Sequence, residues 1–320
     1  MAVAASLAER GLGRTGHNPP VGCIVVKDGV IAGRGWTQNG GRPHAEAMAL
    51  AQAEALAAGA TVYVTLEPCV HVSERGPSCA SLLIGAGVAQ VVAAVQDPDP
   101  RMAGKGFASL REAGIDVITG VASADAVRTL SGFVSRVVRS RPFVTLKLAT
   151  SLDGKIATAD GSSRWITGEA ARAHTHLERA RTDAILVGAG TFRIDNPQLD
   201  VRVAGLEDRS PRRIMLGSGP APAGWDIIHA PRDIGALGCN NVLVEGGAMT
   251  ASAFLKAGLV DRLMLYRAPI LLGDGKSCLG DIGLGSLDDA HGRWQLADTR
   301  QLGNDRLEVY DRANQIGAHA

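Results

Sequence analysis

The sequence predicts an α/β protein of two domains. Its 320 residues exceed the size of one average domain. Short apolar runs rich in β-branched residues alternate with runs of helix-forming residues, and this alternation is typical of an α/β layer with a mostly parallel sheet. A helical stretch at 123–139 interrupts the alternation, and Pro142 ends it. We therefore place the domain boundary near residue 141, between domains at 1–140 and 141–320.

The composition is that of an ordinary globular protein. Hydrophobic residues make up 46% of the chain and charged residues 20%, and the net charge is +1. A near-neutral surface gives no support for binding a polyanion, and an aromatic content of 4% leaves few platforms on which bases could stack. We therefore expect no nucleic-acid partner.

The expected location rests on three features. The N-terminus lacks a basic start followed by a long apolar core, so we expect no signal peptide. No run approaches the ~20 apolar residues of a membrane span, so we expect no membrane partner. The five cysteines are odd in number and widely spread, which favours a reducing compartment over a disulfide framework. Together these features predict a cytoplasmic protein.

In the first domain the predicted elements follow one another closely. Small residues predict a helix at 2–10. The apolar run 21–26 predicts a buried strand, and Asp28-Gly29 turns it back into a partner strand at 30–36, because this dipeptide supplies the positive φ of a hairpin turn. Further helices are predicted at 45–58, 79–87 and 106–113, and further strands at 61–66, 88–95 and 115–118.

Three residues of this domain have the chemistry of zinc ligands: His44, Cys69 and Cys79. A His and two Cys hold zinc in three positions and leave the fourth for water. Glu46 is not needed as a ligand and is placed to move protons to and from that water. His-x-Glu followed by Pro-Cys and a further Cys is the pattern of zinc nucleobase deaminases, although nine residues separate the two cysteines here.

The position of these residues at element starts supports this interpretation. His44 opens one helix, Cys79 opens another, and Cys69 is expected to begin a new element after its strand. Helix N-termini favour thiolates and developing negative charge. A different interpretation stays open, in which His71 is a fourth ligand that closes the zinc site, or the cysteines are ordinary buried thiols.

Asn18 is a candidate contact for a base. It lies just ahead of the strand at 21–26, where its amide could meet the edge of a base. The alternative is a residue that only forms the turn before Pro19.

The second domain begins with a predicted strand at 143–149. A helix is predicted at 169–181, where His174 and His176 lie on different faces, which argues against a joint metal site there. Residues 219–240 are too rich in Pro and Gly to assign. Further strands are predicted at 184–191, 213–216, 241–247, in two pieces within 260–272 around Pro269, and as a closing hairpin at 293–298 and 306–310, with a helix at 248–256.

Two strands of this domain run into glycine turns, at 188–190 and 246–247. A Rossmann turn is not supported, because Arg193 stands where the third glycine should be and Asn196-Pro197 cuts the helix short. Each turn can still let a phosphate approach backbone amides. Arg193 and Arg202 could add charge, although either arginine alone is commonly a surface residue.

Several motifs resemble those of one family. Those of the first domain are His-Asn-Pro-Pro-Val-Gly at 17–22, Pro-His-Ala-Glu at 43–46, Thr-Leu-Glu-Pro-Cys at 65–69 and Gln-Asp-Pro at 96–98. Those of the second are Leu-Lys-Leu-Ala at 146–149, Ser-Leu-Asp-Gly at 151–154, Trp-Ile-Thr at 165–167, Val-Gly-Ala-Gly-Thr at 187–191, Asp-Asn-Pro at 195–197 and Val-Glu-Gly-Gly at 244–247. Over nearly its whole length the chain resembles the bifunctional deaminase–reductase family of riboflavin biosynthesis.

The resemblance implies a cytidine-deaminase-like α/β/α zinc domain, followed by an α/β reductase domain similar in fold to dihydrofolate reductase. It implies two consecutive reactions on a phosphorylated pyrimidine. The first is zinc-dependent hydrolytic deamination of 2,5-diamino-6-ribosylamino-4(3H)-pyrimidinone 5′-phosphate. The second is NADPH-dependent reduction of the ribosyl group to ribityl. The implied cofactors are therefore Zn²⁺ and NADPH, and the resemblance also favours a homo-oligomer.

The matching motifs carry over individual roles. Zinc would be bound by His44, Cys69 and Cys79, with Glu46 as the proton shuttle. The deaminase substrate would contact Asn18, through its pyrimidine, and His71. The NADPH site would be lined by Ala149, Trp165, Thr191, Asp195, Ser218 and Gly247. The reductase substrate would be held by Ser163, Arg179, Leu199, Arg202 and Glu245.

Two segments depart from the family pattern. The loop 70–78 between the zinc cysteines is one residue longer than usual, and Arg75 stands in for its usual basic residue. The segment between Ser218 and Glu245 is shorter than usual, so we expect a strand and a helix of the reductase to be missing or reduced. The alternative to a bifunctional enzyme is thus a deaminase with an inactive reductase half. A nucleic-acid-editing deaminase and a non-catalytic zinc scaffold also share the zinc motif.

Overall fold

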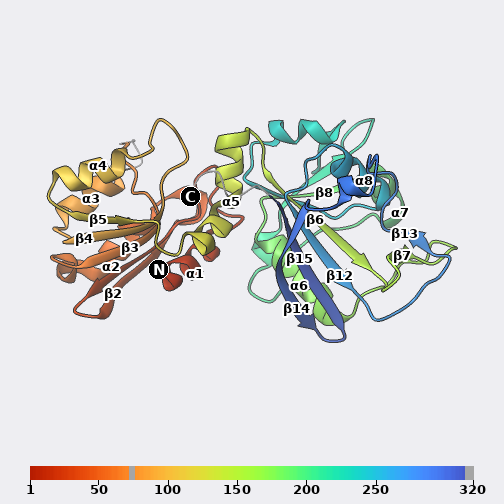
Figure 1. Cartoon of the computed structure of the whole chain (residues 1–320), viewed down its shortest axis with the longest axis horizontal. Helices are drawn as coiled ribbons and strands as arrows, with labels where there is room; N and C mark the ends of the chain where they lie inside the picture. Colours follow the sequence, from red (N-terminus) through yellow and green to blue (C-terminus); the bar gives the residue numbers. More distant parts are fainter. Residues whose placement is uncertain (72–75, 314–320) are drawn as a thin grey trace. The chain divides into compact units, whose positions relative to one another are not determined.

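The computed structural model describes residues 1–71 and 76–313. The chain folds as two compact units, one formed by Met1–Ser140 and one that begins at Arg141 (Figure 1). Arg75 lies outside the described residues, and so does the tail predicted to be loose at 313–320, except for Ala313. Within the described ranges, no helix is both long enough and apolar enough to cross a membrane.

The first unit is a five-stranded sheet packed between helices (Figure 1). Its elements are α1 (Ala2–Ala8), η1 (Glu9–Gly11), β1 (Gly22–Lys27), β2 (Val30–Trp36), η2 (Asn39–Gly41), α2 (Ala45–Ala53), η3 (Glu54–Ala57), β3 (Thr61–Leu66), α3 (Cys79–Gly85), β4 (Gln90–Val95), α4 (Lys105–Glu112), β5 (Asp116–Thr119) and α5 (Ser123–Arg139). Helices α1 and α5 pack together against the sheet, while α2 packs on β1 and β2 and beside α3.

The prediction of a mostly parallel sheet is wrong for the first unit. The strand order is β2-β1-β3-β4-β5, and only the β3–β4 and β4–β5 pairs are parallel. Strand β1 is antiparallel to both of its neighbours. The predicted hairpin turn is present, because Asp28 and Gly29 take φ values of 50° and 77° and reverse the chain within two residues.

The second unit is built on an eight-stranded sheet, with a separate two-stranded sheet beside it (Figure 1). Its elements are β6 (Phe143–Thr150), β7 (Lys155–Ala157), α6 (Glu169–Ala180), β8 (Ala184–Gly188), α7 (Ala189–Asp195), η4 (Glu207–Arg209), β9 (Arg212–Leu216), β10 (Asp226–Ile228), η5 (Pro231–Leu237), β11 (Asn241–Val244), α8 (Ala248–Lys256), β12 (Arg262–Arg267), β13 (Lys276–Ser277), η6 (Asp288–Ala290), β14 (Trp294–Leu302) and β15 (Asp305–Arg312).

The large sheet is mostly parallel, as predicted. Its order is β10-β9-β8-β11-β6-β12-β15-β14, and all pairs from β10 to β12 are parallel. Strands β15 and β14 form the predicted closing hairpin and pair antiparallel. Alternate residues of β8 enter different clusters, Leu186 with Phe254 of α8 and Ile185 with Leu199. Both faces of the sheet are therefore covered.

One expectation for the second unit needs correction. Only the first of the two strand pieces expected within 260–272 forms, as β12, because Pro269 has no N–H with which to continue the ladder. The segment between Ser218 and Glu245, in which we expect a strand and a helix to be missing or reduced, contains a short strand, β10, and a 3-10 helix, η5. Strand β10 has three residues and extends the sheet beside β9.

Candidate active site

Helix α2 presents His44 and Glu46 because it packs unusually close to β2. A Cβ added to Gly33 or Gly35 would lie 2.0 Å from a carbonyl oxygen of α2. Only glycine permits this approach. His44 is the N-cap of α2, and Glu46 lies in its first turn. The position of both side chains is thus set by two glycines on the neighbouring strand.

The three predicted zinc ligands lie together. Cys79 is the first residue of α3. Cys69 follows β3 in an irregular segment, so the expectation that it begins a new element is wrong. The ligand atoms of His44, Cys69 and Cys79 all lie within 4.8 Å of one another. The Nδ1 atom of His44 is 3.2 Å from Sγ of Cys79 and 3.7 Å from Sγ of Cys69.

These distances fit zinc. Tetrahedral zinc at its usual bond lengths separates a nitrogen from a sulfur ligand by about 3.6 Å. The two observed nitrogen–sulfur distances, 3.2 and 3.7 Å, lie on either side of that value. Among the described residues, His71 is not part of the ligand group, which has three members. This arrangement corresponds to an open rather than a closed zinc site.

The two thiols differ in acidity. A hydrogen bond from Cys79 lowers the pKa of Cys69 to about 4, although burial opposes this. The same hydrogen bond, together with burial, raises the pKa of Cys79. Both thiols bind a metal as thiolates, so metal binding would release protons from this group.

Glu46 has the environment of a group that exchanges protons. Its side chain is 3% exposed. Burial raises the pKa of its carboxyl group, and the neighbouring His44 partly offsets this increase. Among the described residues Glu46 is not part of the metal-ligand group, and it lines the same cavity as the three ligands.

A cavity of 430 Å³ opens onto the ligand group. It has the size of a small-molecule site. Both substrate contacts predicted for the first domain, Asn18 and His71, line it. Gly41 makes room for Asn18, because a Cβ there would lie 2.0 Å from Nδ2 of Asn18, and the φ of Gly41 is 84°.

Besides Glu46, acidic residues that sequence reasoning missed line this cavity, and two of them, Glu67 and Asp97, interact. Burial, with help from the charge of Glu67, raises the pKa of Asp97 to about 6. Both residues belong to the quoted motifs, at 65–69 and 96–98, but neither received a role. The two residues lie close together because the loop between β4 and α4 returns to the end of β3.

In the second unit, the residues predicted to line the cofactor site lie at one edge of the sheet. Strands β6, β8, β9 and β11 run parallel, so the segments that follow them meet at their carboxyl ends. Ligands of open α/β sheets bind at this edge. Ala149 lies at the end of β6, Thr191 follows β8, Ser218 follows β9, and Gly247 follows β11. Thr191 and Gly247 are in contact, because Oγ1 of Thr191 accepts a hydrogen bond from the Gly247 amide at 3.2 Å.

The turns at this edge are closely packed. A Cβ on Gly188 would lie 2.2 Å from Oγ1 of Thr250 in α8, and one on Gly246 would lie 2.5 Å from Cβ of Thr250. A Cβ on Gly190 would meet no atom within 4 Å. Space therefore remains beside Gly190 in the first turn of α7, where a phosphate-bearing cofactor could lie.

The segment that carries Ser163 and Trp165 is tied to the same edge. Arg164 lies 3.7 Å from the Asp195 carboxylate at the end of α7. The indole of Trp165 is 66% exposed, and the guanidinium of Arg172 lies 4.8 Å from its ring. Ser163 is exposed.

A buried ion pair joins Arg179 of α6 to Glu245, the residue after β11. The Nε–Oε1 and Nη2–Oε2 distances are 2.7 and 2.9 Å, the bidentate geometry that favours Arg over Lys. Arg179 also donates to the carbonyl oxygen of Asp200 at 3.0 Å. Burial by itself raises the pKa of Glu245, but Arg179 and Lys147 outweigh it, so this pKa is lowered.

Lys147 is a site residue that sequence reasoning missed. Its Nζ lies 3.9 Å from Oε2 of Glu245. Burial lowers the pKa of Lys147, and Glu245 opposes that change. A Lys between two leucines of a buried strand was the available signal, because such a position normally holds an apolar residue or a paired charge.

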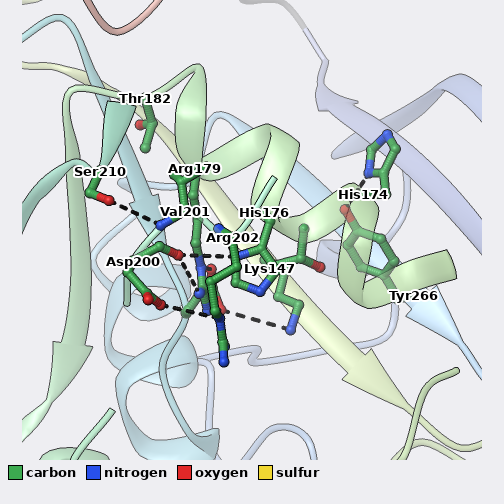
Figure 2. A network of polar contacts seen from close by, with 12 residues as sticks. Lys147, His174, His176, Arg179, Thr182, Asp200, Val201, Arg202, Ser210 and Tyr266 are labelled. Carbon is green, nitrogen blue, oxygen red and sulfur yellow. Dashed lines mark hydrogen bonds and ion pairs between the residues drawn. The ribbon is translucent and has the colours of Figure 1, made fainter. Parts of the chain in front are cut away.

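The remaining predicted substrate residues lie on the loop after α7. Arg202 contacts the carboxylate of Asp200, with Nε and Oδ1 3.4 Å apart (Figure 2). The side chain of Leu199 is 4% exposed and packs in the core. His174 and His176 point to different partners, Tyr266 and the carbonyl oxygen of Asp200 (Figure 2).

Comparisons with known families assign a class to each unit. Residues 1–95 match the cytidine and deoxycytidylate deaminase zinc-binding region. Residues 142–223 and 225–307 match the RibD C-terminal domain. The fold and the His/Cys/Cys group thus define a zinc-binding deaminase domain joined to a reductase-type domain.

Relatives over the full length identify the family. The riboflavin biosynthesis protein RibD of Escherichia coli is 39% identical over 355 residues, which cover 95% of this chain and 96% of that protein. RibD of Mycobacterium tuberculosis is 41% identical over 312 residues, covering 92% and 91%. The chain belongs to the RibD family of riboflavin biosynthesis proteins, and it is a bifunctional enzyme with a deaminase domain and a reductase domain.

Solved structures agree. Acinetobacter baumannii RibD superposes with a TM-score of 0.88 at 36% identity, covering 97% of both chains. A diaminohydroxyphosphoribosylaminopyrimidine deaminase/5-amino-6-(5-phosphoribosylamino)uracil reductase of Thermotoga maritima gives a TM-score of 0.87 at 34% identity, covering 98% of this chain and 97% of that one. The predicted family, two-domain fold class and bifunctional activity are confirmed. The deaminase with an inactive reductase half, the nucleic-acid editor and the zinc scaffold are not favoured.

Proposed function

We propose that residues 1–140 deaminate 2,5-diamino-6-ribosylamino-4(3H)-pyrimidinone 5′-phosphate and that residues 141–320 reduce the ribosyl group of the product to ribityl with NADPH. The observation that carries the proposal is the zinc-ligand group with Glu46 beside it in one cavity. The name of the Thermotoga maritima protein, which covers both reactions, supports the choice of substrate.

In the deaminase domain, His44, Cys69 and Cys79 would hold the zinc ion. When bound, zinc lowers the pKa of water to roughly 7 and so makes it nucleophilic at neutral pH. The carboxylate of Glu46 takes a proton from the attacking water and passes it to the departing amine, which leaves as ammonia. Asn18 and His71 would orient the substrate in the cavity.

In the reductase domain, the carboxyl edge of the sheet would hold NADPH through Ala149, Trp165, Thr191, Asp195, Ser218 and Gly247. NADPH supplies a hydride when bound, and the protein needs to hold the two reactants in line.

The reductase substrate would lie beside the buried ion pair. Arg179 and Glu245 would hold its polar groups, with Ser163 beside them, and Arg202 would bind its phosphate. Leu199 would act through its backbone, because its side chain is buried.

We further propose a cytoplasmic homo-oligomer. A reducing compartment suits the thiolate ligands, and all five cysteines are free. Strand β14 lies at the edge of its sheet with most of its residues exposed, which leaves its backbone open to a second chain. Light scattering of the purified protein would report the mass, and a single-chain mass at micromolar concentration would refute self-association.

A two-stage assay tests the proposed reactions. The zinc-loaded protein is given the diaminopyrimidine ribosyl phosphate, ammonia release is recorded, and NADPH is then added and its oxidation recorded. We expect ammonia first and oxidation second. Absence of ammonia with zinc bound would refute the deaminase proposal for this substrate, and ammonia without oxidation would refute the reductase proposal.

A further inference from the structure

The carboxylate of Glu67 is the hub of the loop that connects β4 to α4. Its side chain is 4% exposed. Oε2 accepts hydrogen bonds from the amides of Asp97 and Gly104 at 3.1 and 3.0 Å. Oε1 accepts from the amides of Gly106 and Phe107 at 2.7 and 3.3 Å. One side chain thus binds four amides across eleven residues of the chain.

Glu67 also supplies the N-terminal cap that α4 itself lacks. The N-cap of α4, Gly104, has no side chain to cap the helix, and the first turn contains no acidic residue. The unpaired amides of a helix start attract a negative charge. Gly106 lets the helix approach, because a Cβ there would lie 2.1 Å from the Pro68 carbonyl oxygen. Glu67 therefore caps α4 from a different element.

The loop held in this way is a wall of the deaminase cavity. Asp97, Asp99 and Met102 all line that cavity. Glu67 is two residues from the zinc ligand Cys69 along the chain. The same short segment therefore carries a zinc ligand and, through Glu67, holds the part of the cavity wall that is formed by the β4–α4 loop.

We propose that Glu67 is a positioning residue for the deamination, one that holds the wall at 97–102 at a fixed distance from the zinc ligands. The inference rests on the proposed deaminase function. Glu67 itself neither binds the metal nor moves the proton. Its role is to keep the cavity at the width of the substrate.

The test is Glu67→Gln in the zinc-loaded full chain. The Gln side chain keeps the shape of Glu67 but carries no charge, and its NH₂ group would face two backbone N–H donors. We expect the KM for the diaminopyrimidine substrate to rise about tenfold with kcat changed by less than about threefold. Zinc content, and NADPH oxidation on preformed deaminated substrate, should stay unchanged. Amide hydrogen exchange should accelerate only within 97–107.

Asp183→Asn is the matched control. Asp183 lies in the second unit, and its carboxylate also accepts two backbone amides, those of Asn240 and Asn241 at 3.0 and 2.8 Å. The Asp183→Asn substitution should leave the deaminase KM unchanged.

The possible outcomes separate this proposal from the proposed deaminase function. An unchanged KM would overturn the proposal, and so would zinc loss or faster exchange throughout the first unit, because these would mark a merely structural role. If the wild-type protein releases no ammonia, the proposed function fails, and the exchange pattern alone then decides whether Glu67 fixes this loop.

Discussion

Replacing Glu245 by Gln tests the buried ion pair of the reductase unit. The side chains of Arg179 and Glu245 are 11% and 9% exposed, so water screens their charges little. Gln keeps the shape of the side chain but removes the charge, and it places an NH₂ group against a guanidinium N–H. Arg179 and Lys147 would then remain buried without their anion.

The magnitude follows from these contacts. Removing one partner of a buried pair costs about 3–5 kcal/mol of unfolding free energy. One lost hydrogen bond to a charged group accounts for about 1.5–3 kcal/mol of this. Arg179 keeps its bond to the Asp200 carbonyl oxygen at 3.0 Å. We therefore expect a loss of about 3–4 kcal/mol, or roughly 6–16 °C in the Tm of the second unit.

Urea unfolding followed by tryptophan fluorescence measures this loss, because Trp165, Trp225 and Trp294 all lie in the second unit. The control is Asp281→Asn. Asp281 contacts Lys256 at 2.6 Å, but these side chains are 70% and 58% exposed, and such surface pairs contribute little to stability. The reasoning is refuted if Glu245→Gln destabilises the unit no more than this control does.

The pH dependence of the stability loss in Glu245→Gln gives a second check that the charge of Glu245 is its cause. The folded-state pKa of Glu245 lies below its ordinary value of 4.5, because Arg179 and Lys147 outweigh the effect of burial. A lowered acid pKa stabilises the fold above the unfolded-state pKa, and this stability is lost as the pH falls through the folded-state pKa. The deficit of Glu245→Gln should be full at pH 7 and shrink below pH 4.5. A deficit that stays constant down to pH 3 would show that charge is not its cause.

Four further predictions concern the deaminase unit. Glu46→Gln should lower ammonia release by about 100- to 10,000-fold, while zinc content and NADPH oxidation on preformed deaminated substrate stay normal; retained ammonia release would remove its proton role. Chelation of zinc should abolish ammonia release, zinc should restore it, and NADPH oxidation on preformed deaminated substrate should continue. Gly41→Ala should raise the deaminase KM, because its Cβ would displace Asn18, and an unchanged KM would place Asn18 outside the substrate contacts. Burial raises the pKa of Asp97 to about 6, so ionisation of this carboxyl group destabilises the fold as the pH rises toward that value. In the zinc-free protein, Asp97→Asn should therefore increase the stability at pH 7 but not at pH 3. Melting curves of both proteins at the two pH values would check this.

Much of the fold could be predicted from local patterns. The strand predicted at 61–66 and the helix predicted at 123–139 coincide with β3 and α5. The hairpin at Asp28-Gly29 was predicted for the right reason, since positive φ is a property of a few residue types. The predictions went wrong where pairing is long-range. The antiparallel pairing of β1 with β3 depends on partners that no local window contains.

The sequence by itself determined the chemistry of the first unit. His44, Glu46, Cys69 and Cys79 were chosen by residue type and spacing, because zinc and proton transfer accept few side chains. Local patterns also identified the glycine turns after β8 and β11.

Only the tertiary structure decided which polar residues act together. Lys147, Arg179 and Glu245 lie on β6, on α6 and after β11, and their charges become a buried cluster only when those elements pack. Glu67 and the amides at 97–107 are likewise joined through space. The physical reason is that burying a charge costs free energy unless it is paired with oppositely charged or hydrogen-bonding groups. In this protein those groups come from distant parts of the chain.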